Sequence, residues 1–126
     1  MLTPEVTYLP DGIIEISYEG IFKVEDWQNY QRLMLELLNA TENRLYILSN
    51  FVKIESFSRE IVPQVGTAPH LTHPKLGMLV LLGGNALQNF VMQLTQLRAR
   101  QANRDSNLRV HTDRSRALEV LTHFRT

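Results

Sequence analysis

The chain has 126 residues, the size of one domain, with 44% hydrophobic and 21% charged residues, as is typical of a folded globular protein. It has no cysteine, which excludes disulfides, thiolate metal sites and a cysteine nucleophile. Its 13 basic and 13 acidic side chains balance, so no overall charge draws it towards nucleic acid or anionic lipid.

The ends and the charge distribution of the chain are also informative. Residues 1–10 lack the basic and apolar regions of a secretory signal, and the longest apolar run, 78–82, is too short to cross a membrane. We therefore expect a single cytoplasmic domain over residues 1–126. Residues 1–70 carry five basic and ten acidic side chains, and residues 71–126 carry eight and three. This asymmetry predicts a charge dipole that favours head-to-tail contacts.

The first elements have the pattern of a β-hairpin. Residues 6–8 lead into a turn at 9–12, where Pro10 presets one torsion and Gly12 accepts a positive φ. Apolar and polar residues then alternate up to Gly20, which predicts a strand with one face in solvent. The residues expected to face inward are Ile14, Ile16 and Tyr18, and those expected to face solvent are Glu15, Ser17 and Glu19.

A helix and a buried strand follow the hairpin. Residues 24–38 repeat apolar side chains with a helical period, and the acidic Glu25 and Asp26 lie in the first turn, where they complement the helix dipole. Residues 45–48 are a short continuous apolar run, which is typical of a strand covered on both faces. We expect this strand to be central in the sheet.

The segment 49–74 is the least regular part of the chain. Ser58 could cap a helix, but Pro63 lies too deep in it for a continuous one, so we expect a short or broken helix. Residues 69–74 have the composition of a loop or a last helical turn. Residues 77–82 then predict a second fully buried strand, followed by a glycine-rich turn at 83–85.

The last third of the chain predicts two helices around a short strand. The first helix ends near Arg100, strand 108–111 follows a polar loop, and Thr112 or Asp113 caps the closing helix. The expected buried stripes are Leu87, Phe90, Val91, Leu94 and Leu97, then Ala117, Leu118, Leu121 and Phe124. The predicted order is β-β-α-β-α-β-α-β-α: an α/β domain whose mixed sheet has an N-terminal antiparallel hairpin, parallel later strands and helices on each face.

This order and three short stretches resemble a known family. The stretches are 73–77, 84–87 and 112–121, and with the element order they resemble the STAS domain, the fold of anti-sigma-factor antagonists, and the related sporulation stage II AA-like superfamily. The resemblance implies regulation by protein contact, often with a phosphorylatable hydroxyl at the start of the helix after the third strand. The family's aspartate–hydroxyl–glycine run is absent here, and Ser56 and Ser58 occupy that place as phosphorylation candidates.

Two segments are candidate binding sites. The first contains Phe51, Val52, Ile54 and Phe57, which either close over the sheet end as core or form a surface for a partner or ligand. Loops at the carboxyl ends of strands are where open α/β sheets bind ligands. The second is Gly83-Gly84-Asn85, which is either a tight turn or an anion site at a helix N-terminus.

Other residue patterns point away from metal, nucleic acid and catalysis. His70 and His73 are three residues apart but have no third ligand nearby, so we expect solvated loop histidines, and His111 and His123 are expected at the surface. The arginines between residues 98 and 116 lack interleaved aromatic side chains, which favours an acidic protein partner over nucleic acid. No nucleophile–base set can be assembled, so we expect neither an enzyme nor a bound cofactor or metal.

The sequence therefore predicts a non-enzymatic regulatory or protein-interaction module with an unidentified protein partner, or a homodimer. The alternative is a protein that binds a small molecule, a lipid or an anion, through its strand-end loops.

Overall fold

The computed structural model describes the backbone of residues 1–126 and all side chains except those of Val65, Ala86 and Leu87. Leu87, which was predicted to be buried, is thus outside the described side chains. Five strands and three α-helices alternate along the chain, with three single-turn 3-10 helices between β3 and β4. Their bounds are β1 Glu5–Tyr8, β2 Ile13–Phe22, α1 Val24–Ala40, β3 Leu45–Phe57, η1 Arg59–Ile61, η2 Val65–Thr67, η3 Pro69–Thr72, β4 Leu76–Leu82, α2 Ala86–Gln101, β5 Leu108–His111 and α3 Arg114–Arg125.

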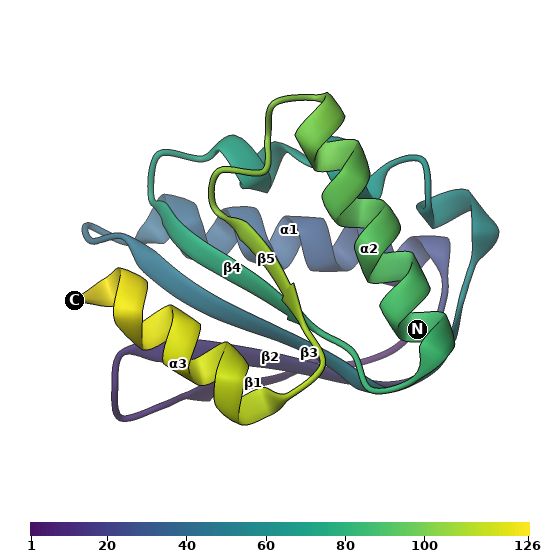
Figure 1. Ribbon diagram of the computed structural model, residues 1–126, viewed down its shortest axis with the longest axis horizontal. Coiled ribbons are helices and arrows are strands. Elements are labelled where there is room, and N and C mark those ends of the chain that lie inside the picture. Colours follow the sequence, from purple (N-terminus) through teal and green to yellow (C-terminus); the bar gives the residue numbers. More distant parts are fainter.

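The five strands form one sheet in chain order, β1-β2-β3-β4-β5, with β1 antiparallel to β2 and all later neighbours parallel. Parallel crossovers are right-handed, and here every crossover moves one strand in the same direction. The connections therefore lie on one face of the sheet, which α1 and α2 cover. Helix α3 follows the last strand and covers the opposite face (Figure 1). The predicted mixed sheet with helices on both faces is confirmed.

The helix ends are fixed by side-chain and backbone caps. The Asp26 carboxylate accepts hydrogen bonds from the backbone N–H groups of Lys23, at 2.9 Å, and Leu2, at 2.7 Å, so it holds the N-terminal segment against α1. Asp113 caps α3 by accepting from the Ser115 N–H. Helix α2 ends in a Schellman motif around Asn103, whose φ of 57° lies in the left-handed region.

Two strands are longer than the sequence predicts. Strand β2 continues through Gly20, whose φ of +113° accompanies an irregular register, and ends at Phe22. Strand β3 runs on to Phe57, so the predicted loop after residue 48 is wrong. Residues 49–57 instead continue the strand and form an extended two-stranded ribbon with β2. The predicted broken helix after Ser58 is instead the three 3-10 helices.

Several side chains also differ from the predicted burial. Phe90 and Leu97 on α2 are 64% and 46% exposed, and Phe124 on α3 is 43% exposed, because these helices bury other faces. Glu15 is only 9% exposed, since α3 covers the face of β2 that was expected to meet solvent.

Candidate functional site

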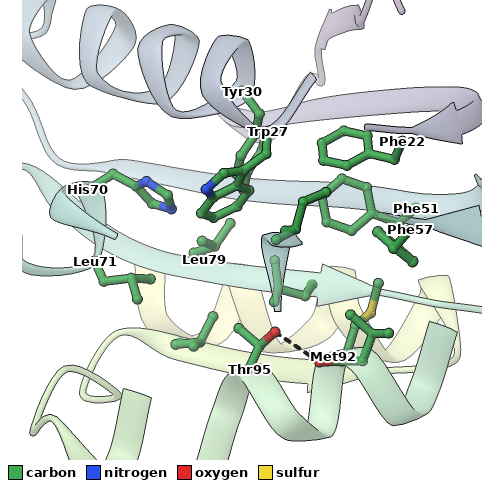
Figure 2. Close-up of a pocket in the computed structure, with 14 residues that line it drawn as sticks. Phe22, Trp27, Tyr30, Phe51, Phe57, His70, Leu71, Leu79, Met92 and Thr95 are labelled. Carbon is green, nitrogen blue, oxygen red and sulfur yellow. Dashed lines mark hydrogen bonds between the residues drawn. The ribbon is translucent and has the colours of Figure 1, made fainter. Parts of the chain in front are cut away.

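An apolar cavity of about 30 Å³ lies between the sheet and the helices that cover its α1 face (Figure 2). Strands β2 to β5, helices α1 and α2, and the 3-10 helices η1 and η3 contribute to its wall. The side chains that line it are Phe22, Trp27, Tyr30, Phe51, Phe57, Ile61, His70, Leu71, Leu79, Leu81, Val91, Met92, Thr95 and Leu108.

One end of the cavity is an aromatic cluster on the β2–β3 ribbon. The rings of Phe22 and Phe51 have centroids 5.7 Å apart, and Phe57 lies 5.8 Å from Phe22 and 6.0 Å from Phe51. These rings meet because β3 continues beyond the end of β4 and pairs there with β2 alone. The extension of β3 thus supplies the wall at this end.

The other end of the cavity carries unpaired polar atoms. Among the side chains that the structure describes, three buried polar atoms lack a hydrogen-bond partner: Tyr18 Oη, Trp27 Nε1 and His70 Nδ1. Trp27 and His70 both line the cavity, their ring centroids are 6.3 Å apart, and the indole nitrogen is on the side of Trp27 turned towards His70 (Figure 2).

The other described polar groups of the cavity wall are paired. The Tyr30 hydroxyl is 2.7 Å from the Ser49 hydroxyl, and the Thr95 hydroxyl donates to the Val91 carbonyl at 2.9 Å. Buried polar groups in folded proteins are rarely left unpaired, and each exception calls for an explanation. Trp27 and His70 are such exceptions.

His70 is buried rather than solvated, which corrects the expectation from the sequence. It lies in η3, is 2% exposed, and packs edge-on against Tyr30 with ring centroids 5.6 Å apart. Burial lowers the pKa of the imidazole to about 4, so it is neutral at physiological pH. The flanking Pro69 and Pro74 suggested a solvent loop. The signal for burial was Leu71, which follows His70 and enters the core with it.

The α3 face of the sheet has a polar cluster of a different kind. The Arg114 guanidinium donates two hydrogen bonds to the Glu15 carboxylate, at 2.6 and 3.1 Å, and the Asn50 amide donates a third at 3.0 Å. The bond from Arg114 lowers the pKa of Glu15, against the opposing effect of burial. Both oxygens of the Glu15 carboxylate are paired, and the cluster joins α3 to β2.

With both faces described, comparison with known proteins identifies the fold. No family model and no curated protein matches the chain. It superposes on the crystal structure of an uncharacterised DUF3478-family protein with a SpoIIAA-like fold from Shewanella loihica PV-4, with a TM-score of 0.62 and 12% identity, over 95% of this chain and 93% of that one. The fold is SpoIIAA-like. This confirms the fold predicted from the resemblance, and at this identity it shows the fold alone.

The SpoIIAA-like fold separates the four apolar residues of the first predicted site. Phe51 and Phe57 line the cavity, and Ile54 is buried in the core at 1% exposure. Val52 is 43% exposed and lies beside Gly84. Phe51 and Ile54 are therefore part of the core, as one of the two alternatives from the sequence predicts. The segment that carries them is a strand and not a loop.

The second predicted site, Gly83-Gly84-Asn85, forms a tight turn at the start of α2. The N–H of Gly83 donates to the His111 carbonyl at 3.2 Å, and the N–H of Gly84 donates to the Gln88 side chain at 2.6 Å. Asn85 caps the helix by accepting from the Gln88 N–H. Because these N–H groups are already paired, they do not offer an anion site.

The two phosphorylation candidates lie at the end of the β2–β3 ribbon. Ser56 is half-buried in β3 opposite Ile21, and Ser58 precedes η1 with its hydroxyl on the Glu60 carboxylate. A three-residue 3-10 helix provides no helix dipole of the kind the resemblance implies, and Glu60 would repel a phosphate. Phosphorylation of either serine stays a prediction.

Within the described residues, no group of three or more His, Asp or Glu side chains could hold a metal ion. In the same part of the chain, no helix has the length and apolar character needed to cross a bilayer.

Proposed function

We propose that this SpoIIAA-like domain is a non-enzymatic binding protein that takes a small, mostly apolar molecule into the cavity between α1, α2 and the sheet. The observation that carries the proposal is the cavity itself, whose described wall is almost entirely aromatic and aliphatic. Apolar cavities with a few convergent polar groups are the usual form of small-molecule sites. The proposal corresponds to the small-molecule alternative that the sequence left open.

The size of the cavity determines how a ligand would enter. A cavity of about 10–15 Å³ holds one water, so the 30 Å³ here admits a small group without rearrangement. A larger ligand requires the wall to open. Met92 is a flexible part of the wall, and Phe57 is half-buried at the ribbon end. The 3-10 helices η1 and η3, which form another part of the wall, have few backbone hydrogen bonds to break.

Native mass spectrometry of gently purified protein, compared with its denatured mass, tests the proposal directly. We expect a non-covalent adduct of low mass, or, for empty protein, a rise in melting temperature when small aromatic compounds are added. A matched control is Leu81→Trp, which fills the cavity from β4 and should abolish the rise. Absence of any adduct, together with an unchanged melting temperature across a panel of such compounds, would overturn the proposal.

A second candidate function, a protein-interaction module, is supported by the outer face of α2. Phe90 and Leu97 are 64% and 46% exposed and lie seven residues apart, two helical turns along one face. Exposed apolar side chains grouped in this way are typical of contact surfaces. The occupant that we expect is a second copy of the chain.

Light scattering coupled to size exclusion measures that association. We expect a dimer that the double substitution Phe90→Ser with Leu97→Ser converts to monomer, while substitution of the exposed Thr122 by Ser on α3 leaves it unchanged. A monomer at all concentrations would reject the homodimer. Native mass spectrometry separates the two candidate functions, since only the first predicts an added small mass.

A further inference from the structure

We infer that Trp27 and His70 together form the polar end of the cavity and select a ligand that carries one hydroxyl group on an otherwise apolar body. The inference rests on the proposed function and goes further, because it names the chemical class of the ligand and the two atoms that recognise it.

The polar atoms around the cavity fall into a paired and an unpaired group. On Tyr30 and Thr95 the hydroxyl groups are already paired, whereas Trp27 Nε1 and His70 Nδ1 have no partner. Both residues are more than nine-tenths buried, at 5% and 2% exposure, so bulk water does not satisfy them. Leaving such groups unpaired costs about 1–3 kcal/mol each. A ligand that pairs both would recover part of this cost.

The two unpaired atoms differ in their chemistry. An indole N–H only donates a hydrogen bond, so the ligand atom facing Trp27 must be an acceptor. When the proton of the neutral imidazole is on Nε2, His70 Nδ1 accepts a hydrogen bond, and in this tautomer the ligand facing it must offer an O–H. A hydroxyl oxygen does both: it accepts from the indole and donates to the imidazole. The indole nitrogen faces His70, which suits one shared oxygen (Figure 2).

The cavity wall excludes a charged ligand. No charged side chain is among the described residues that line the cavity, and burial keeps His70 neutral, with a pKa of about 4. A carboxylate in this position would have no countercharge in an apolar site, and burying an unpaired charge is costly. The site therefore fits a small phenol or alcohol and not the corresponding acid.

Phenol, toluene and benzoate make a matched set of probes for this site. Phenol and toluene have nearly the same shape and differ by a hydroxyl in place of a methyl, and benzoate adds the charge. Trp27 is the chain's single tryptophan, so its indole N–H gives one resonance that reports on the site without further assignment. Each probe is titrated into isotope-labelled protein while this resonance is followed.

We expect phenol to bind about fivefold more tightly than toluene, the effect of one net hydrogen bond. Phenol should also shift the indole N–H resonance in the direction of stronger hydrogen bonding, and benzoate should not bind. The variant His70→Phe should reduce the preference for phenol over toluene, because only the indole contact to the hydroxyl remains. The control Glu15→Gln changes a buried polar side chain on the α3 face, away from the cavity, and should leave the fivefold preference intact.

Trp27→Phe is a second variant, in case His70→Phe does not fold, and its affinities are measured by saturation transfer on the probes. Equal binding of phenol and toluene, with the indole resonance unmoved, would overturn the recognition of a hydroxyl by Trp27 and His70. The proposed binding of apolar molecules would still stand. Tighter binding of benzoate than of phenol would also overturn it. Failure of all three probes to bind would contradict both this inference and the proposed function.

Discussion

The two faces of the sheet use polar side chains in opposite ways. On the α3 face, Glu15 is buried, and both oxygens of its carboxylate accept hydrogen bonds, from Arg114 and Asn50. On the α1 face, Trp27 and His70 are buried at least as deeply, and each keeps one atom without a partner. The first arrangement positions a helix. The second is costly for folding, and the proposed ligand would offset this cost by pairing with the two groups.

The two faces also differ in how they are packed. The crossover connections pass over the α1 face, so the irregular 3-10 segment lies there and leaves a cavity against the sheet. The α3 face is closed by a single helix with a small core of its own, around Leu48 and Val80. The cavity described above thus lies on the α1 face, opposite α3.

The largest expected effect is the loss of the whole fold on substitution of Leu79. Leu79 is 1% exposed in β4, lines the cavity and belongs to the core of the α1 face. Because a carboxylate there has no partner, we expect Leu79→Asp to abolish folding. Circular dichroism and solubility measure this outcome, with Leu79→Met as the control that keeps the fold. A soluble, cooperatively melting Leu79→Asp variant would contradict the assignment of β4 to the core.

A pH titration separates the two faces. Burial lowers the pKa of His70 from 6.5 to about 4, so the unfolded chain binds a proton that the folded chain does not between these values. Stability is therefore complete above pH 6.5 and falls as the pH drops towards 4, by about 3 kcal/mol in total. The lowered pKa of Glu15 has its effect in a more acidic range, as pH falls below its usual value of 4.5.

Urea unfolding at a series of pH values measures both contributions. We expect His70→Phe to remove the loss of stability between pH 6.5 and 4, and Glu15→Gln to leave that loss in place. A wild-type stability that stays flat over this interval would contradict the buried neutral state of His70.

The third expected effect is confined to the cluster of Glu15, Arg114 and Asn50 on the α3 face. Arg114→Met leaves the Glu15 carboxylate with the Asn50 amide as its one remaining partner, which should lower the free energy of unfolding by about 1–3 kcal/mol. The double variant Glu15→Leu with Arg114→Met removes both charges and should recover much of this loss. Affinity for a cavity ligand should not change, since Arg114 lies on the other face. A double variant less stable than Arg114→Met would reject the pairing as the cause.

Much of the fold could be predicted because its elements have clear periods. Helix α1, strand β4 and strand β5 appear within two residues of their predicted bounds. The end of β3 could not be predicted, for a physical reason. The irregular register against β2 places Phe51, Ile54 and Phe57 three residues apart rather than two, which hides the alternation of a strand.

The cavity could be predicted only in part. The helical period of residues 24–38 places Trp27 and Tyr30 on the buried side of α1, and the structure confirms their burial. Phe51 lines the cavity, and its contact with a ligand stays a prediction. The burial of His70 depends on η3 folding back over α1, and that of Glu15 depends on an arginine 99 residues away. Such contacts leave no local pattern in the sequence.

The strand order in chain sequence has a kinetic consequence for the molecule. The parallel strand pairings each join residues about thirty positions apart, such as Ile13 with Tyr46 and Leu79 with Leu108. The Arg114–Glu15 bridge closes a loop of 99 residues. Closing it costs about 1 kcal/mol more in chain entropy than closing one of the strand pairings. The sheet can therefore assemble one neighbour at a time, and the bridge fastens α3 across the finished strands. Arg114→Met should accordingly speed unfolding and leave the folding rate nearly unchanged.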